Sequence, residues 1–301
     1  MRRVGTTEEA CCAGRFNRRI RLEVFRPSPA LAPYITHLWV YDIPIAAHVG
    51  EPVMLTVLPD VFTFACFLCG DPLQVAHKHQ IYTSRSAVSG FRTLRFDILG
   101  HGDLTGVAVR FTSWGLRHFL PGSAEAFADS RVACRDIFPC SAIEDLESKL
   151  FHLPFAHARV RCVEKFLLTQ LRNSTIDRLT CAVAQSIVRD GGQSPLSQLA
   201  CDFELSERTL ERRFRRAIGV GPKKYARVVR LQNAFRQRAA CRSWADIAQT
   251  AGYFDQAHLI RECRDMVGVA PETVFASPPS QTAQAFQTLA QMSDLSNTVF
   301  C

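Results

Sequence analysis

The chain has 301 residues, 47% of them apolar and 21% charged, and a formal net charge of +8, which are values of an ordinary globular protein long enough for two domains. No run of 18 apolar residues occurs, and no apolar segment follows the N-terminal arginines, so we expect neither a membrane-spanning helix nor a secretory signal. The 12 cysteines have no repeating spacing, and we expect most of them to be reduced, buried thiols of a cytoplasmic protein.

The N-terminal half has the sequence pattern of strands. Residues 1–20 are basic and poor in large apolar side chains, and we expect them to form a flexible tail. The stretches "LTVLPDVFTFACFL" and "LTGVAVRF" are rich in Val, Phe and Thr, and turns containing Gly or Asp-Pro separate such stretches. They predict a mostly antiparallel β domain over 21–155. Flanking helices are predicted at 141–151 and 157–173, the second within a linker helix over 156–175.

Beyond residue 176 the pattern changes to short helices. The fold class is therefore predicted to be α+β, with an all-α C-terminal domain over 176–277. The pair Gly191–Gly192 predicts the end of the first helix of this domain. Residues 278–301 are rich in Gln, Ser and Thr, and we expect a disordered tail there.

Two helices joined by a tight turn are predicted around "LSERTLERRF" (205–214). Ser194 is expected to cap the first helix and Pro195 to open it, while Ser206 is expected to cap the second. Apolar residues recur at helical spacing on one face of each helix. These residues are Leu196, Leu199, Ala200 and Phe203 on the first helix, and Leu210, Phe214 and Ala217 on the second. The layout predicts a helix-turn-helix.

The same layout returns about 49 residues later, with a turn that is one residue longer. Gly252 lies in this turn, and Asp255 is expected to cap the helix that follows it. The two predicted apolar faces are Trp244, Ile247, Ala248 and Ala251, then Leu259, Cys263 and Met266. Two such units in tandem, joined by a basic helix, are a stronger signal than one alone.

The positive charge lies in one part of the sequence. Residues 207–242 contain 12 Lys or Arg against Glu207 and Glu211, so the rest of the chain is close to neutral. A local basic patch is typical of a nucleic-acid binder, although a merely solvated basic face gives the same count. Two rigidly spaced basic helices fit a periodic polyanion better than the irregular surface of an acidic protein partner.

The residues that carry these patterns resemble a known family. The segments "SERTLERRFRRAIGVGPKKYARVVRLQNA" (206–234) and "ADIAQTAGYFDQAHLIRECRDMVGVAP" (245–271) are similar to the two halves of the AraC-type (AraC/XylS) transcriptional regulators. Cys263 and the pair Met266–Val267 depart from the aromatic residues usual there. The region from "FRPSPALAPYITHLWVYD" to "LTGVAVRFTSWGLRHFLPGSAEAFAD" resembles an N-terminal domain that accompanies some of these regulators. The resemblance implies effector sensing or dimerisation by that domain.

A DNA-binding function makes the outward residues of each second helix candidate contacts. Recognition helices meet base edges with their N-terminal part, while surrounding groups hold phosphates. Arg208 and Arg212 are suited to guanine, and Glu211 either accepts from cytosine or pairs with Arg215. The predicted base-reading residues are Arg208, Glu211, Arg212, Gln256, His258 and Arg261, with a surface polar role as the alternative for His258. The predicted phosphate contacts are Ser206, Arg213, Arg215, Arg216, Lys223, Lys224 and Asp255, with Arg227 beside them.

The implied partner is double-stranded DNA, read in successive major grooves about 10 bp apart. The first recognition helix should supply most of the electrostatic affinity and the second mainly discrimination. A small-molecule effector, a homodimer and, for an activator, RNA polymerase are the other partners that the resemblance implies. No cofactor and no membrane partner is expected.

The cysteines and histidines offer two other functions. Cys66, Cys69, His77 and His79 offer zinc ligands, but their spacing is not that of a zinc finger, and a strand through Cys66 points the two thiols to opposite faces. A thiol-based sensor would use some pair among Cys11, Cys12, Cys134 and Cys140. These two readings make a thiol- or metal-responsive regulator the alternative function.

Nothing in the sequence predicts an enzyme. No G-x-S-x-G, no phosphate-binding glycine loop and no H-E-x-x-H occurs. The scattered histidines His101, His118 and His152 are expected to have structural or surface roles.

Overall fold

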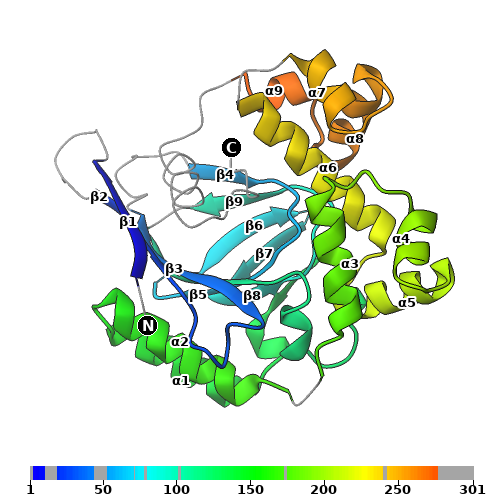
Figure 1. Ribbon diagram of the computed structural model, residues 1–301. Helices are drawn as coiled ribbons and strands as arrows, with labels where there is room; N and C mark the ends of the chain where they lie inside the picture. The colour runs from blue at the N-terminus through cyan, green and yellow to red at the C-terminus, as the bar shows by residue number, and fades with distance from the viewer. Residues whose placement is uncertain are drawn as a thin grey trace.

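The computed structural model describes residues 3–10, 19–43, 53–70, 72–77, 80–100, 103–172, 175–239 and 243–276. Two antiparallel sheets form the N-terminal half, and helices form the C-terminal half (Figure 1). This is the α+β class that the sequence predicts. Within the described ranges, no helix is both long and apolar enough to cross a membrane.

The larger sheet has seven strands in the order β1-β2-β3-β10-β5-β8-β11, and neighbouring strands pair antiparallel. Its strands are β1 (Arg3–Ala10), β2 (Arg19–Phe25), β3 (Ile35–Ile43), β5 (Thr63–Leu68), β8 (Ser86–Ser89), β10 (Leu104–Phe111) and β11 (Arg131–Ala133). The second sheet has the order β4-β9-β6-β7. It contains β4 (Val53–Val57), β6 (Leu73–His77), β7 (Gln80–Ser84) and β9 (Phe96–Gly100).

Strand β1 corrects the expectation of a flexible tail over residues 1–20. It pairs antiparallel with β2, from Arg3 opposite Phe25 to Ala10 opposite Arg19. Edge strands expose unpaired backbone amides and carbonyls, so a further strand can pair there without large apolar side chains of its own. Residues 11–18 lie outside the described ranges, and so does the predicted tail over 278–301.

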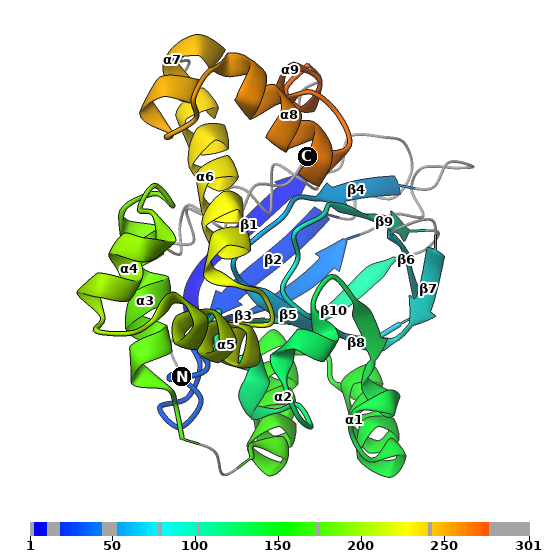
Figure 2. The same ribbon diagram turned by 90° about the vertical axis from the view of Figure 1, so that its right-hand side faces the viewer.

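Strand alternation gives the larger sheet two buried faces, since successive side chains point to opposite sides. On β3, Leu38 and Val40 face one core, while Trp39 and Tyr41 face the other. The first core is closed by helices α1 (Cys140–His152) and α2 (Ala156–Gln170), which lie along one face of the sheet (Figure 2). The second core lies between the two sheets.

Helix α2 packs as part of the N-terminal domain. Val160 and Val163 are fully buried, and the Phe166 ring contacts Phe67 of β5 with 5.8 Å between ring centroids. The helix was expected to be a linker because its sequence is amphipathic and precedes the change in pattern. Its apolar face instead completes the core that the sheet leaves open. Three single-turn helices, η1 (Leu116–His118), η2 (Ala124–Phe127) and η3 (Cys134–Asp136), lie between β10 and α1.

The C-terminal half consists of α3 (Arg178–Arg189), α4 (Leu196–Asp202), α5 (Glu207–Ile218), α6 (Pro222–Ala239), α7 (Trp244–Thr250), α8 (Gln256–Val267) and α9 (Pro271–Val274). Helix α6 runs from the group α3–α5 to the group α7–α9 (Figures 1 and 2). Gly191 and Gly192 follow α3 with φ of +70° and +77°, as a glycine helix stop requires. The expected cap Ser194 is wrong, because Pro195 occupies the N-cap position of α4, and the backbone N–H of Ser194 donates to Asp190 instead.

The two halves share a packed interface. The helical core extends to Leu58, Val61 and Phe91 of the N-terminal half, and the Phe91 ring lies 5.4 Å from the Tyr225 ring of α6. The amide of Gln232, also on α6, donates to the carbonyl of Pro59. Burial of apolar side chains from both halves in one core fixes the helical domain against the sheets.

Candidate nucleic-acid interface

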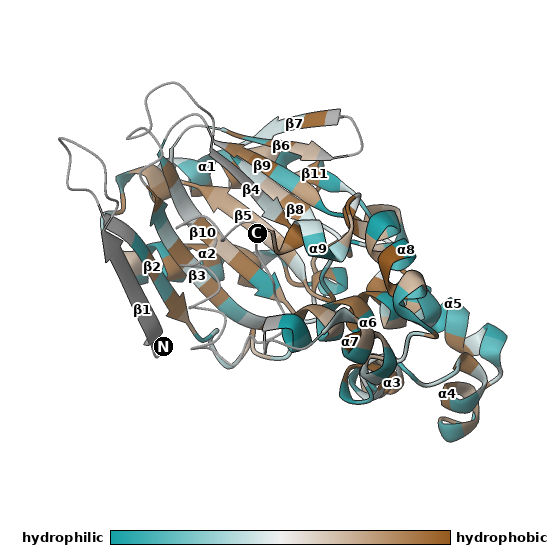
Figure 3. Ribbon diagram, turned by 90° about the horizontal axis from the view of Figure 1, so that it is seen from above, coloured by the Kyte–Doolittle hydropathy of each residue, from teal (hydrophilic) through white to brown (hydrophobic). Residues whose placement is uncertain are grey.

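Helix α5 begins at the cap that its sequence predicts. Ser206 Oγ accepts from the backbone N–H of Thr209 at 3.2 Å, which satisfies one of the free amides of the first turn. Leu210 and Phe214 are fully buried, and Ile218 continues their stripe in place of the expected Ala217, which is half-buried. The outer side of the helix is consequently polar, as the hydrophilic colouring in Figure 3 shows.

Helix α8 repeats this construction. Asp255 Oδ1 accepts from the backbone N–H of His258 at 2.7 Å, so the predicted cap is confirmed. Leu259, Cys263 and Met266 are buried on its inner side. Cys263 and Met266 thus fill the positions where the family usually has aromatic residues, and α8 packs on the scaffold without them.

An unpaired set of polar side chains projects from the two helices and the start of α6. Each residue of this set is exposed, and none forms a hydrogen bond or ion pair with another residue in the described ranges. Arg208 and Arg212 lie one turn apart on α5, as the spacing predicts. The set consists of Arg208, Arg212, Arg216, Lys223, Lys224, Gln256 and Arg261. All seven are predicted contact residues.

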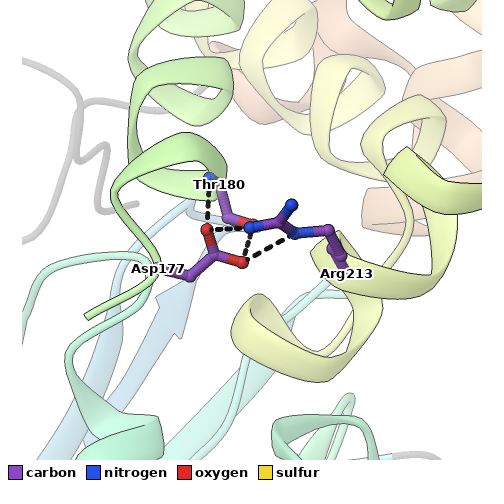
Figure 4. A network of polar contacts seen from close by, with 3 residues as sticks. All are labelled: Asp177, Thr180 and Arg213. Atoms are coloured by element: carbon purple, nitrogen blue, oxygen red, sulfur yellow. Dashed lines mark hydrogen bonds and ion pairs between the residues drawn. The ribbon is translucent and has the colours of Figure 1, made fainter. Parts of the chain in front are cut away.

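Arg213, one of the predicted phosphate contacts, is paired within the protein. Its Nε and Nη2 donate to the two carboxylate oxygens of Asp177 at 3.1 and 2.8 Å, while Asp177 also caps α3 through Thr180 (Figure 4). Burial alone would raise the pKa of Asp177, but the hydrogen bonds from Arg213 and Thr180 outweigh it and lower that pKa. The arginine charge is therefore neutralised within the protein, where it holds α5 against α3.

Glu211 and Arg215 pair one turn apart, which is the off-DNA state predicted for Glu211. Arg215 Nη2 lies 2.8 Å from Glu211 Oε1, and Arg215 Nη1 lies 3.4 Å from Glu125 Oε1 of the N-terminal half. Glu211 also lies against Gly221, where a Cβ would come within 2.1 Å of its carboxylate. Arg215 is thus shared between its own helix and the N-terminal domain.

Two further candidates on the second unit are engaged. His258 Nδ1 accepts from the backbone N–H of Phe254 at 3.4 Å, and the ring packs edge-on to Tyr253. His258 is thus held within its own helix-turn-helix unit, and its contact with DNA stays a prediction. Arg227 Nε donates to the buried Glu262 at 2.6 Å, so this cation holds α8 against α6 instead of facing a phosphate.

The C-terminal ends of both recognition helices attach to the N-terminal domain. At the end of α5, Gly219 lies against the carbonyl of Ala124, where a Cβ would come within 2.9 Å of that oxygen. At the end of α8, the carbonyl of Met266 accepts from the backbone N–H of Arg95 at 2.9 Å. The N-terminal ends of both helices carry the caps and the unpaired side chains of Arg208 and Gln256, and they are the parts that meet bases in a helix-turn-helix.

A groove runs along the starts of α4, α5 and α6. Its walls include Gln193, Pro195 and Glu207 together with three cations, Lys223, Arg227 and Arg230. Free backbone amides at the first turns of α5 and α6 add partial positive charge to this groove. The combination suits a phosphate oxygen.

Phe254 is a surface residue that the sequence patterns did not single out. It precedes the cap Asp255, and 92% of its side chain is exposed. A large apolar residue such as Phe254 is usually assigned to the core. The sequence signal for its exposure is its position in the turn, outside the apolar stripe of α8. An apolar side chain here is suited to a thymine methyl group.

The described cysteines and histidines do not form a metal site. Cys66 packs beside the core between the sheets and Cys69 lies in the core under α1 and α2, as strand alternation predicts. His79 and the side chain of His77 lie outside what the structure describes, and no group of three potential metal ligands occurs within it. Cys134 is fully buried, and burial raises the pKa of its thiol, which disfavours a reactive thiolate. Cys11 and Cys12 fall in the undescribed ranges, while Cys140 is exposed.

Comparison with known proteins agrees with this geometry. Residues 199–277 match the family described as "Helix-turn-helix domain", and residues 23–133 match "Domain of unknown function (DUF6597)". None of the curated proteins compared with the chain matches it.

Several solved structures are distantly similar. ToxT from Vibrio cholerae is 10% identical, with 79% of this chain and 97% of that chain covered and a TM-score of 0.42. ToxT from Vibrio cholerae O395 bound to (E)-4-(8-methylnaphthalen-1-yl)but-3-enoic acid has the same identity and coverage and a TM-score of 0.43. The AraC-like transcriptional activator CuxR is 11% identical, with 73% and 86% covered and a TM-score of 0.23. At these sequence identities and TM-scores the structural likeness is remote.

The tandem helix-turn-helix units, their caps and the match over 199–277 agree with one another. Domains of this class bind DNA in transcription regulators. The chain thus contains an AraC-type helix-turn-helix domain over residues 199–277, which follows a domain of unknown function over residues 23–133.

Proposed function

We propose that the chain reads DNA with α5 and α8 in successive major grooves of one duplex face. The observation that carries this proposal is the unpaired set, which places exposed cations and an amide on two capped helices and at the start of α6. Cations that face outward without protein partners keep their full charge for phosphates and guanine.

The scaffold supports a fixed spacing of the two helices. Helix α6 has 18 residues and is therefore about 27 Å long, and it connects the helices around α5 with those around α8. The ion pairs Arg213–Asp177 and Arg227–Glu262 tie each recognition helix to its neighbour, the second along the side of α6. A rigid scaffold of this kind suits major grooves that repeat every ~34 Å along one face of DNA.

The contact residues divide into two groups under this proposal. Arg208, Arg212 and Arg261 read bases, with Gln256 as a partner for adenine. Glu211 leaves Arg215 only if a cytosine amine replaces that partner. Arg216, Lys223 and Lys224 hold phosphates, together with the amides at the caps Ser206 and Asp255.

Because α5 carries more of the unpaired cations than α8, it supplies most of the salt-dependent affinity. The N-terminal domain contacts both recognition helices at their C-terminal ends, so a change in that domain can alter their relative position. We propose that it controls DNA binding in response to a small-molecule effector.

Guanine methylation interference on a duplex selected from a random pool tests the proposal. Binding should be blocked by N7 methylation at two clusters about 10 bp apart on one face of the duplex. Arg208→Ala should remove interference in one cluster and Arg261→Ala in the other. A single cluster, or the same pattern in both variants, would contradict the two-helix arrangement.

A further inference from the structure

The N-terminal domain contains an apolar cavity between its two sheets. The space that it offers to the centre of a water-sized sphere is about 70 Å³. Aromatic and aliphatic side chains from both sheets line most of it, among them Trp39, Tyr41, Phe64, Leu73, Phe96 and Ile98. Cavities of this kind between packed sheets are typical sites for small apolar ligands.

Two arginines interrupt this apolar lining. Arg92 follows β8 and Arg131 begins β11, and their side chains are 4% and 8% exposed. Arg131 Nη1 donates to Ser89 Oγ at 3.4 Å. The Nε and Nη2 atoms of both arginines are buried and have no hydrogen-bond partner among the described residues. Four buried guanidinium nitrogens thus lack an acceptor for their hydrogens, which is costly unless a ligand supplies one.

The surrounding charges do not balance the two arginines. Two carboxylates lie nearby, and each has another partner. Asp60 lies 3.7 Å from the buried Arg110, and Asp129 accepts from the backbone N–H and hydroxyl of Thr93 at 2.6 and 2.7 Å. Three guanidinium groups against two carboxylates leave one positive charge in this interior.

The environment of Arg92 shows how this charge is held. Its guanidinium lies 4.2 Å from the centroid of the Phe96 ring and 5.3 Å from that of Phe64, so aromatic faces partly replace its lost hydration. Burial lowers the pKa of Arg92 to about 10, and nearby Arg131 lowers it further against the opposing effect of Asp60. Arg92 therefore stays protonated at neutral pH.

We propose that this cavity binds a small organic carboxylate, whose two oxygens accept from Arg92 and Arg131 and whose apolar body packs against Trp39, Phe64 and Phe96. A carboxylate supplies the acceptors that the guanidinium groups lack, and its single negative charge balances the interior. The apolar lining excludes a ligand that is polar throughout. This inference gives the effector of the proposed function a chemical class and a site.

The position of Arg92 connects the cavity to the DNA-binding domain. Arg92 lies between Phe91, whose ring packs on Tyr225 of α6, and Arg95, whose backbone N–H donates to Met266 at the end of α8. Asp60 lies between Pro59 and Val61, which also contact the helical domain. A carboxylate that draws Arg92 toward the cavity would therefore move a segment on which the helical domain is docked.

Calorimetric titration of the full chain, without DNA, tests the site with two pairs of probes. Octanoate and hydrocinnamate are the acids, and octanamide and hydrocinnamamide are their uncharged matches. At least one acid should bind and raise the unfolding temperature, and its amide should bind roughly tenfold more weakly or not at all, the loss expected for a missing charged hydrogen bond. Equal binding of acid and amide, or no binding of either acid at millimolar concentration, would overturn the proposal.

Two variants test whether the acid binds in the cavity between the sheets. Arg131→Gln removes one positive charge and should weaken binding of the acid by roughly tenfold or more. Ala108→Leu fills the cavity wall, keeps both arginines and should also abolish binding. Lys165→Gln, which changes an exposed charge on α2, is the control and should bind like the unchanged chain. If Arg131→Gln fails to fold, Ala108→Leu and the comparison of acid with amide still test whether the acid binds in this cavity. Acid binding that survives in Ala108→Leu would contradict the proposed site.

A separate DNA titration keeps this inference distinct from the proposed function. Octanoate should change the affinity for a selected duplex, while octanamide should not. A chain that binds the acid but no specific DNA would retain the carboxylate site and contradict the regulatory role. A chain that binds specific DNA but does not distinguish acid from amide would contradict the carboxylate site alone.

Discussion

The hydroxyl of Tyr225 lies 2.8 Å from Ser113 Oγ, in a hydrogen bond that is buried between the linking helix α6 and the N-terminal domain. Tyr225 is 1% exposed, and burial raises the pKa of its hydroxyl. The same ring packs edge-on to Phe214 of α5 with 5.3 Å between centroids. One residue thus joins the first recognition helix, the linking helix and the N-terminal domain.

Tyr225→Phe should lower the stability of the interface by about 0.5–1.5 kcal/mol, because it removes this hydrogen bond and leaves Ser113 without its partner. Thermal and denaturant unfolding measure the loss. Ser113→Ala should add little in the Tyr225→Phe background, since the two changes remove the same bond. Fully additive losses would show that the two groups do not act as a pair.

Arg208→Ala and Arg261→Ala should each weaken binding to a selected duplex by about 1–3 kcal/mol and relax specificity at one base pair. The reason is that each arginine is unpaired at the base-reading end of its helix. Titration against a panel of single-base variants measures both effects. Lys165→Ala, on α2, is the charge control and should leave affinity and specificity unchanged. An equal loss on every sequence would make either arginine a phosphate contact instead.

Glu125→Gln should release Arg215 from the N-terminal domain while leaving its pair with Glu211 intact. The bridge is half-exposed, so stability should change by less than about 1 kcal/mol. The freed cation is then available to phosphate, so the salt dependence of DNA binding should steepen by about one ion. Affinity measured over a salt series checks this, and an unchanged slope would place Arg215 away from the DNA.

Asp177→Asn should destabilise the chain at neutral pH, with an effect that disappears in acid. The folded-state pKa of Asp177 is lowered, so its contribution is present above the unfolded value, near 3.9, and is lost as the pH falls through the folded value. Unfolding of Asp177→Asn and the unchanged chain should therefore differ most at neutral pH and converge below about pH 4. A difference that stays constant down to pH 2 would assign the effect to packing.

Local patterns predicted most of the helical domain. The caps Ser206 and Asp255 and the stripes through Leu210 and Leu259 depend on residues three to eight positions apart, which periodicity and capping chemistry determine. The pairing of Glu211 with Arg215 was predictable for the same reason. The prediction that Ser194 caps α4 was wrong, because the helix begins one residue later and the backbone N–H of Ser194 donates to Asp190.

The features that sequence patterns missed depend on contacts between distant segments. Arg213 meets Asp177 across 36 positions, so its charge looked available for phosphate until the packing of α3 on α5 was known. Arg92 and Arg131 approach the same cavity only because β8 pairs with β11. Strand β1 was missed because backbone pairing at a sheet edge needs no apolar pattern of its own.

The central claim is that α5 and α8 together read a specific sequence. The most direct test is the ratio of affinity for a selected duplex to affinity for random duplex at one fixed salt concentration. The account predicts a ratio of roughly a thousandfold or more for the unchanged chain. It predicts a ratio near one when Arg208, Arg212 and Arg261 are all changed to Ala. A ratio near one in the unchanged chain, or an undiminished ratio in the triple variant, would contradict it.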